Sequence, residues 1–112
     1  MSIPYYETLL LPLLTFHADK EEHSRRESID HVANDLGLTD QERRELLPSG
    51  QQPTFDNRMG WATTYLAKAG LLERTRRANF KITERGLKLL NTKPSHIDVN
   101  VLKQYPEFQE WP

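Results

Sequence analysis

The chain has 112 residues, of which 37% are hydrophobic and 28% are charged, and this size and composition suit a single globular domain with one core. It contains no cysteine, which excludes disulfides and thiolate metal sites. No apolar run is long enough to cross a bilayer, and no basic segment precedes the first apolar stretch. The sequence therefore predicts a cytoplasmic protein.

The formal net charge is only −1, but the charges are unevenly distributed along the chain. Residues 19–47 hold nine acidic and five basic side chains, a balance of −4, whereas residues 56–93 hold nine basic and three acidic ones, a balance of +6. A one-sided positive field of this kind attracts a polyanion such as a nucleic acid. The alternative is that solvated charges segregate along the sequence without sharing a face.

The first segment predicts a helix that opens near Pro4, because proline suits the first helical turn. Pro12 lies inside the apolar pattern and predicts a kink or a break at that point. The apolar stripe of this helix recurs at helical spacing and consists of the four leucines Leu9, Leu10, Leu13 and Leu14, followed by Phe16 at its end.

Two capping boxes follow a polar connection. Ser24 and Glu27 have the spacing in which each side chain bonds the other's backbone N–H, and the helix that they open ends at Gly37. Thr39 and Glu42 repeat this spacing and predict a short helix that closes at residues 46–47, before a turn at 48–50.

The second half of the chain predicts a longer helix, a hairpin and a final helix. The longer helix spans residues 57–69, with Asp56 as its cap and Gly70 as its end. Residues 71–74 and 80–83 form two short strands joined by a basic loop, and Thr83 caps the last helix. This order of elements predicts a mainly α fold with a small β-hairpin, a winged helix-turn-helix domain over residues 1–92.

Residues 93–112 are predicted to form a C-terminal connector. The segment opens with linker-like residues and ends in an aromatic tail that contains Tyr105, Phe108 and Trp111. Apolar residues this dense seldom stay in water. We expect them to dock on the domain itself, on a second copy, or on a further domain of the protein.

The helix before the hairpin is the element that a winged helix presents to the major groove of DNA. Its outer face is predicted to offer small residues for close approach and polar groups for base edges, while flanking cations and the hairpin reach phosphates. The alternative without a binding function is an ordinary amphipathic helix followed by a solvated turn. The predicted DNA-binding residues are Asn57, Arg58, Gly60, Thr63, Thr64, Lys68, Arg74, Arg76, Arg77 and Lys81.

Patterns typical of enzymes are absent from the sequence. No lysine has Asp, Glu or Gln two residues before it, which is the spacing of a metal-dependent nuclease site. There is also no Gly-rich phosphate loop. The four histidines, His17, His23, His31 and His96, lack metal-ligand spacing and suit surface or helix-end positions. We therefore predict no catalytic residues, no metal and no cofactor. Double-stranded DNA is the expected partner, and a protein-interaction or dimerisation module or a stand-alone transcription regulator are the alternatives.

Three stretches of the sequence resemble the N-terminal domain of the Mrr family of modified-DNA restriction endonucleases. They are IPYYETLLLPLL at residues 3–14, LLPSGQQPTFDNRMGWA at 46–62 continuing to YLAKAGLL at 65–72, and FKITERG at 80–86. The resemblance implies a winged-helix DNA-recognition domain, followed in the family by a nuclease domain to which residues 97–108 would lead. It also implies methylated DNA as the target. Phe55 and Trp61 are both expected in the core rather than in an aromatic cage.

Overall fold

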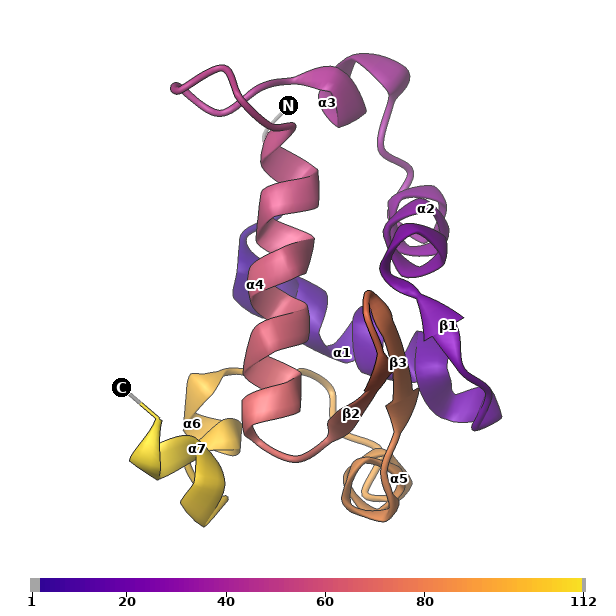
Figure 1. Cartoon of the computed structure of the whole chain (residues 1–112), viewed down its shortest axis with the longest axis vertical. Helices are drawn as coiled ribbons and strands as arrows, with labels where there is room; N and C mark the ends of the chain where they lie inside the picture. The colour runs from indigo at the N-terminus through magenta and orange to yellow at the C-terminus, as the bar shows by residue number, and fades with distance from the viewer. Residues whose placement is uncertain (1–2, 112) are drawn as a thin grey trace.

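A computed structural model gives the fold and describes residues 3–111. The structure is mainly α-helical with one small antiparallel sheet, in a winged-helix-like order of elements (Figure 1). None of the helices in the described range is long and apolar enough to cross a membrane. The elements are α1 (Tyr6–Phe16), the 3-10 helix η1 (His17–Asp19), β1 (His23–Ser24), α2 (Arg25–Asp35), α3 (Asp40–Arg44), α4 (Thr54–Lys68), β2 (Leu72–Arg76), β3 (Asn79–Ile82), α5 (Glu84–Asn91), α6 (Val99–Leu102) and α7 (Pro106–Glu110).

The core forms where α4 crosses α1 (Figure 1). The apolar stripe predicted for α1 is buried, since Leu9, Leu10, Leu13 and Leu14 are completely inaccessible to solvent. Pro12 neither breaks nor ends this helix, which runs unbroken to Phe16. A proline in a helix interior removes one backbone hydrogen bond, and the four fully buried leucines around it supply enough apolar burial to offset that loss.

Local signals for helix ends are confirmed at both capping boxes, at Thr83 and at the two glycines that follow a helix, Gly37 and Gly70, and they are wrong at two places. Both capping boxes form as predicted, and the Thr83 hydroxyl accepts from the first turn of α5. However, α3 already ends at Arg44, because Leu46 pairs with Pro53 in an isolated β-bridge. That bridge lets α4 begin at Thr54 with Pro53 as its N-cap residue, so Asp56 lies inside the first turn and is not the cap.

The predicted hairpin is confirmed and is longer than expected. Strand β2 extends to Arg76 and β3 begins at Asn79, which leaves a tight turn at the tip. A third strand, β1, pairs with β3 through His23 and Ser24, so the strand order is β1-β3-β2. Two residues are too few for an alternating pattern, and the sequence shows β1 only as a helix cap.

The C-terminal segment packs on the rest of the chain. The exposed fraction is 1% for Ile97, 0% for Leu102 and 7% for Phe108. All three belong to the same apolar cluster as α1 and α4. Of the three docking places that the sequence left open, the structure therefore shows docking on the domain itself, and α7 lies against the end of α4 (Figure 1).

Candidate nucleic-acid interface

One face of α4 points away from the core. At 100° per residue, Asn57, Trp61, Thr64 and Lys68 follow each other along a single stripe, opposite the buried Phe55, Met59, Ala62 and Leu66. We call these four residues the outer stripe. Asn57 donates a side-chain hydrogen bond to Gln52 of the preceding loop, with an N–O distance of 3.2 Å. The outer stripe thus carries an amide, a hydroxyl, an ammonium group and an indole.

The side chains of two predicted contact residues of α4 are hydrogen-bonded to backbone carbonyls of the chain itself. Thr63 is 2% exposed, and its hydroxyl donates to the Met59 carbonyl at 2.8 Å, so the prediction that it lies on the outer face is wrong. It shares a flank of the helix with Asp56, seven residues earlier, and Arg26 of α2 contacts that flank through Asp56. Arg58 also points inward, because its guanidinium donates to the carbonyl of Ile3 at 2.7 Å.

At 100° per residue, Gly60 lies between the outer stripe and the flank of α4 that carries Asp56 and Thr63. A Cβ atom built on this glycine has no other atom within 4 Å. Glycine in a helix interior costs about 1 kcal/mol relative to alanine, and nothing in the fold of this chain requires that cost at residue 60. The glycine therefore leaves one position without a side chain beside the outer stripe, and we call this position the notch.

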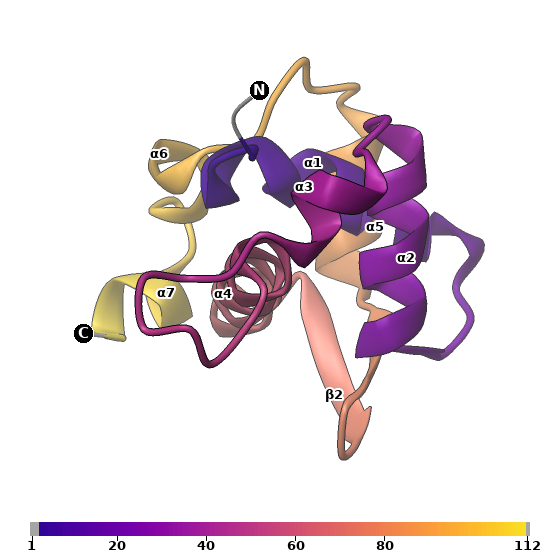
Figure 2. The ribbon, with the colours of Figure 1, turned by 90° about the horizontal axis from the view of Figure 1, so that it is seen from above.

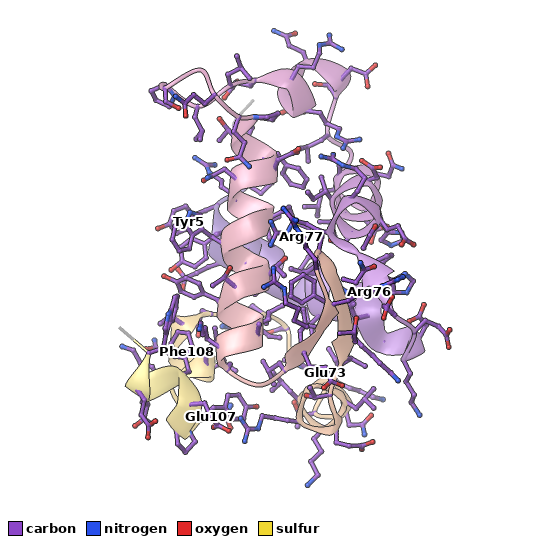
Figure 3. All side chains as sticks on the ribbon, viewed as in Figure 1. Tyr5, Glu73, Arg76, Arg77, Glu107 and Phe108 are labelled. Atoms are coloured by element: carbon purple, nitrogen blue, oxygen red, sulfur yellow. The ribbon has the colours of Figure 1, made fainter. Side chains whose placement is uncertain are left out.

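The hairpin of β2 and β3 projects from the body of the molecule beside α4 (Figure 2). Arg77, at the tip, lies on the α4 side of the hairpin in the view of Figure 3, whereas Arg76 lies toward β1. The hairpin and α4 therefore lie side by side, as the wing and the helix of a winged helix do. Most of β2 is exposed, since only Leu72 of its five residues is buried.

Arg76 is engaged within the chain, which the sequence does not reveal. Its Nε donates to the carboxylate of Glu22 at 2.9 Å, across the sheet from the segment before β1. Hydrogen bonding with Thr75 and the charge of Arg76 hold the pKa of Glu22 below its usual range. A carboxylate thus lies on the flank of the wing that was predicted to bind phosphate.

The other predicted cations lie on the surface without an acidic partner. Within residues 3–111, no salt bridge involves Lys68, Arg74, Arg77 or Lys81. Lys68 is 5.9 Å from the centre of the Trp111 ring, and Arg74 is equally far from that of Phe80. Stacking on a ring leaves the charge of a cation available to a phosphate. These four exposed residues are named the open cations below.

Phe55 lies in the core, as the sequence predicts, whereas the same prediction for Trp61 is wrong. Phe55 is completely buried, but the Trp61 side chain is 51% exposed. The signal was present in the spacing, because Trp61 lies four residues after Asn57 and seven before Lys68, which are both outward positions. Its bulk and apolar character favoured the opposite interpretation.

Among the described residues, no three His, Asp or Glu side chains are arranged to hold a metal ion. His17 is the C-cap residue of α1, which agrees with the surface or helix-end position expected for each histidine, and it is buried. It is 2% exposed, its Nδ1 lies 3.0 Å from the Leu13 carbonyl, and its Nε2 has no hydrogen-bond partner within residues 3–111.

Comparison with known proteins gives the same family over most of the chain as the resemblance seen in the sequence. A family model described as the Mrr N-terminal domain matches residues 6–92. The chain belongs to the Mrr N-terminal domain family. It is also similar to the type IV methyl-directed restriction enzyme EcoKMrr of Escherichia coli strain K12, with 33% identity over 95 residues. That alignment covers 84% of this chain and 31% of the enzyme. No solved structure gives a significant match.

The family assignment makes this chain a restriction-system domain of the Mrr type. The match to 31% of EcoKMrr means that the chain spans about a third of that relative's length. The resemblance seen in the sequence is thereby confirmed, because the matched residues 6–92 include the stretches at 46–62 and 80–86 that carry it.

Proposed function

We propose that this Mrr N-terminal domain binds double-stranded DNA, with α4 in the major groove and the β2–β3 hairpin on the backbone. The observation that carries the proposal is the position of the hairpin beside α4 (Figure 2), whose exposed face carries the outer stripe. Helix and wing then face the same side of the molecule, so that polar groups of α4 meet base edges while wing cations meet phosphates.

The electrostatic contribution is assigned to the open cations. Lys68 lies at the end of α4, while Arg74, Arg77 and Lys81 lie on the hairpin. Phosphate contacts of this kind supply sequence-independent affinity and make binding depend on salt. Arg58 and Arg76 contribute less, because each already donates to an oxygen of the chain itself.

Direct contacts to bases are assigned to the outer stripe. Asn57 and Thr64 can donate and accept hydrogen bonds at base edges, and the notch at Gly60 lets the duplex approach the helix closely. Thr63 takes no part, since its hydroxyl is buried and bonded to Met59. This set is smaller than the one that the sequence predicts, and it is continuous on one face.

The relative EcoKMrr is described as a methyl-directed restriction enzyme. We infer from this description that methylated duplex is the target and that another domain of the protein carries the nuclease activity. We propose that this chain recognises DNA without cleaving it, and that residues 93–112 lead toward a nuclease domain. A homodimer on a two-fold-related site is compatible with this proposal. Tail aromatics are weak anchors for such a dimer, because Phe108 is 7% exposed and packs in its own core.

Fluorescence anisotropy of a labelled duplex across a salt series tests the proposal. Binding should weaken with salt, with a log–log slope of about −0.9 per phosphate contact. Lys68→Ala and Arg77→Ala should each weaken binding to all duplexes and reduce that slope by about one contact. Lys88→Ala, which removes an exposed charge on α5, is the matched control and should leave the slope unchanged. No binding at low salt would contradict the proposed function.

A further inference from the structure

Trp61 is an unusual occupant of the outer stripe. It is 51% exposed and stands between Asn57 and Lys68, in a row of groups that are otherwise polar or charged. Because its indole faces away from the core, the fold does not need it for apolar burial. A large apolar side chain that is half exposed at the centre of the proposed binding helix is available for contact with a group outside the chain.

The indole is supported from one side. Its ring meets the ring of Tyr65 edge to face, with centroids 6.4 Å apart and planes at 83°. Tyr65 is itself held by three further rings at centroid distances of 4.9, 5.7 and 5.1 Å, those of Tyr6, Phe108 and Trp111. Trp61 therefore loses little side-chain freedom on binding, which lowers the entropic cost of a contact.

The helix surface beside Trp61 carries no side chain at residue 60. Gly60 precedes Trp61 directly, and a Cβ atom on Gly60 would meet no atom beyond its own neighbours in the helix within 4 Å. A group outside the chain that approaches α4 beside the indole therefore meets no side chain at this position.

The major groove offers one apolar feature that such a group can contact. All base edges there present hydrogen-bond donors and acceptors, and the C5-methyl group of thymine is the exception. The apolar face of an indole on a helix in that groove gains free energy where a methyl group is buried against it. The indole can donate a hydrogen bond only through Nε1–H, and Asn57 and Thr64, on the same stripe, add acceptors as well as donors.

We propose that Trp61 is a specificity-determining residue of this domain and that it contacts the C5-methyl group of a pyrimidine, thymine included. This inference rests on the proposed function. It adds a preference that follows the methyl group rather than the base that carries it. A 5-methylcytosine and a thymine at the contacted position would then be accepted alike, because both place a methyl group on C5.

Duplexes of identical sequence, prepared with either thymine or uracil, test the inference without knowledge of the binding site, because they differ only in C5-methyl groups. The parent should bind the thymine duplex about fourfold more tightly, the fold-change expected from burying one methyl group. A uracil duplex with 5-methylcytosine in place of cytosine should recover part of that affinity. Trp61→Ser should bind thymine and uracil duplexes equally, with an unchanged salt slope, whereas Trp61→Phe should keep the preference.

Tyr5→Ser is the matched control, since Tyr5 is a 58% exposed aromatic residue outside the outer stripe, and it should keep the thymine preference. Equal affinity of the parent for both duplexes, or a preference that survives Trp61→Ser, would overturn the role of Trp61 while salt-dependent binding still supports the proposed function. Absence of duplex binding at low salt would overturn both. Circular dichroism and thermal unfolding confirm that each variant is folded.

Discussion

Glu22 and Arg76 are 54 residues apart in the sequence and are joined by a 2.9 Å contact between the carboxylate and Nε. The contact ties the segment before β1 to the outer strand of the wing. Both side chains are accessible enough for water to screen the pair, so it contributes little to stability. Its larger effect is electrostatic, because it adds a negative charge to the hairpin that the proposed function brings close to the DNA backbone.

Glu22→Gln should therefore tighten DNA binding at low salt. Two unit charges about 4 Å apart in water interact by ~1 kcal/mol, so the expected gain is about fivefold and should shrink as salt rises. Anisotropy with one labelled duplex measures it. Glu21→Gln removes the same charge from an exposed neighbour that makes no salt bridge within residues 3–111 and should have a smaller effect. Equal gains would show that only net charge matters.

Gly60→Ala should change stability and binding in opposite directions. The added methyl group meets open space, so the free energy of unfolding should rise by about 0.5–1 kcal/mol. Binding should weaken, because the same methyl group fills the notch beside the outer stripe. Urea unfolding and anisotropy give the two values. If binding is unchanged while stability rises, the notch does not face DNA.

Gly86 provides a contrast within the same chain. A Cβ atom there would overlap the Leu71 carbonyl oxygen and crowd Ile82. Gly86→Ala should consequently destabilise the fold, which would show that the effect expected at residue 60 is specific to its open surroundings.

Leu102→Ala should lower the free energy of unfolding by about 2–5 kcal/mol, the usual range for a fully buried leucine. Leu102 is 0% exposed although it lies in the C-terminal segment. Denaturant unfolding measures the loss, and Lys103→Ala, at the exposed neighbouring position, should stay within about 0.5 kcal/mol of the parent. A Leu102→Ala variant as stable as the parent would mean that the tail unfolds independently of the core.

Stability should pass through a maximum near pH 6.5, the ordinary pKa of histidine. Burial lowers the pKa of His17, so the unfolded chain binds more protons there and stability falls as the pH drops below 6.5. Burial works against the charged ring of His23 as well, but hydrogen bonds to Asp19 and Glu27 raise its pKa. The stability from His23 is complete below 6.5 and is lost as the pH rises through its folded-state pKa.

Urea unfolding of the parent, His17→Gln and His23→Gln from about pH 5 to 8.5 separates the two histidines. His17→Gln should flatten the acid side of the maximum, and His23→Gln should flatten the alkaline side. A parent whose stability is constant over this range would contradict both assignments.

Local chemistry in the sequence determined much of the fold. The capping boxes at Ser24 and Thr39 formed as predicted, because both partners of each box lie within one helical turn and need no tertiary contact. The apolar spacing of α1 and α4 likewise determined which residues pack in the core. The family resemblance came from sequence alone, and the match over residues 6–92 confirms it.

Tertiary structure decided what depends on partners distant in sequence. The Leu46–Pro53 bridge set the start of α4, the pairing of β1 with β3 added a third strand, and Glu22 engaged Arg76. Helical spacing gives the direction of a side chain but not which neighbouring elements cover it. For that reason Thr63 proved to be buried, and the face proposed to bind DNA became defined only once α2, the hairpin and α7 had packed around α4.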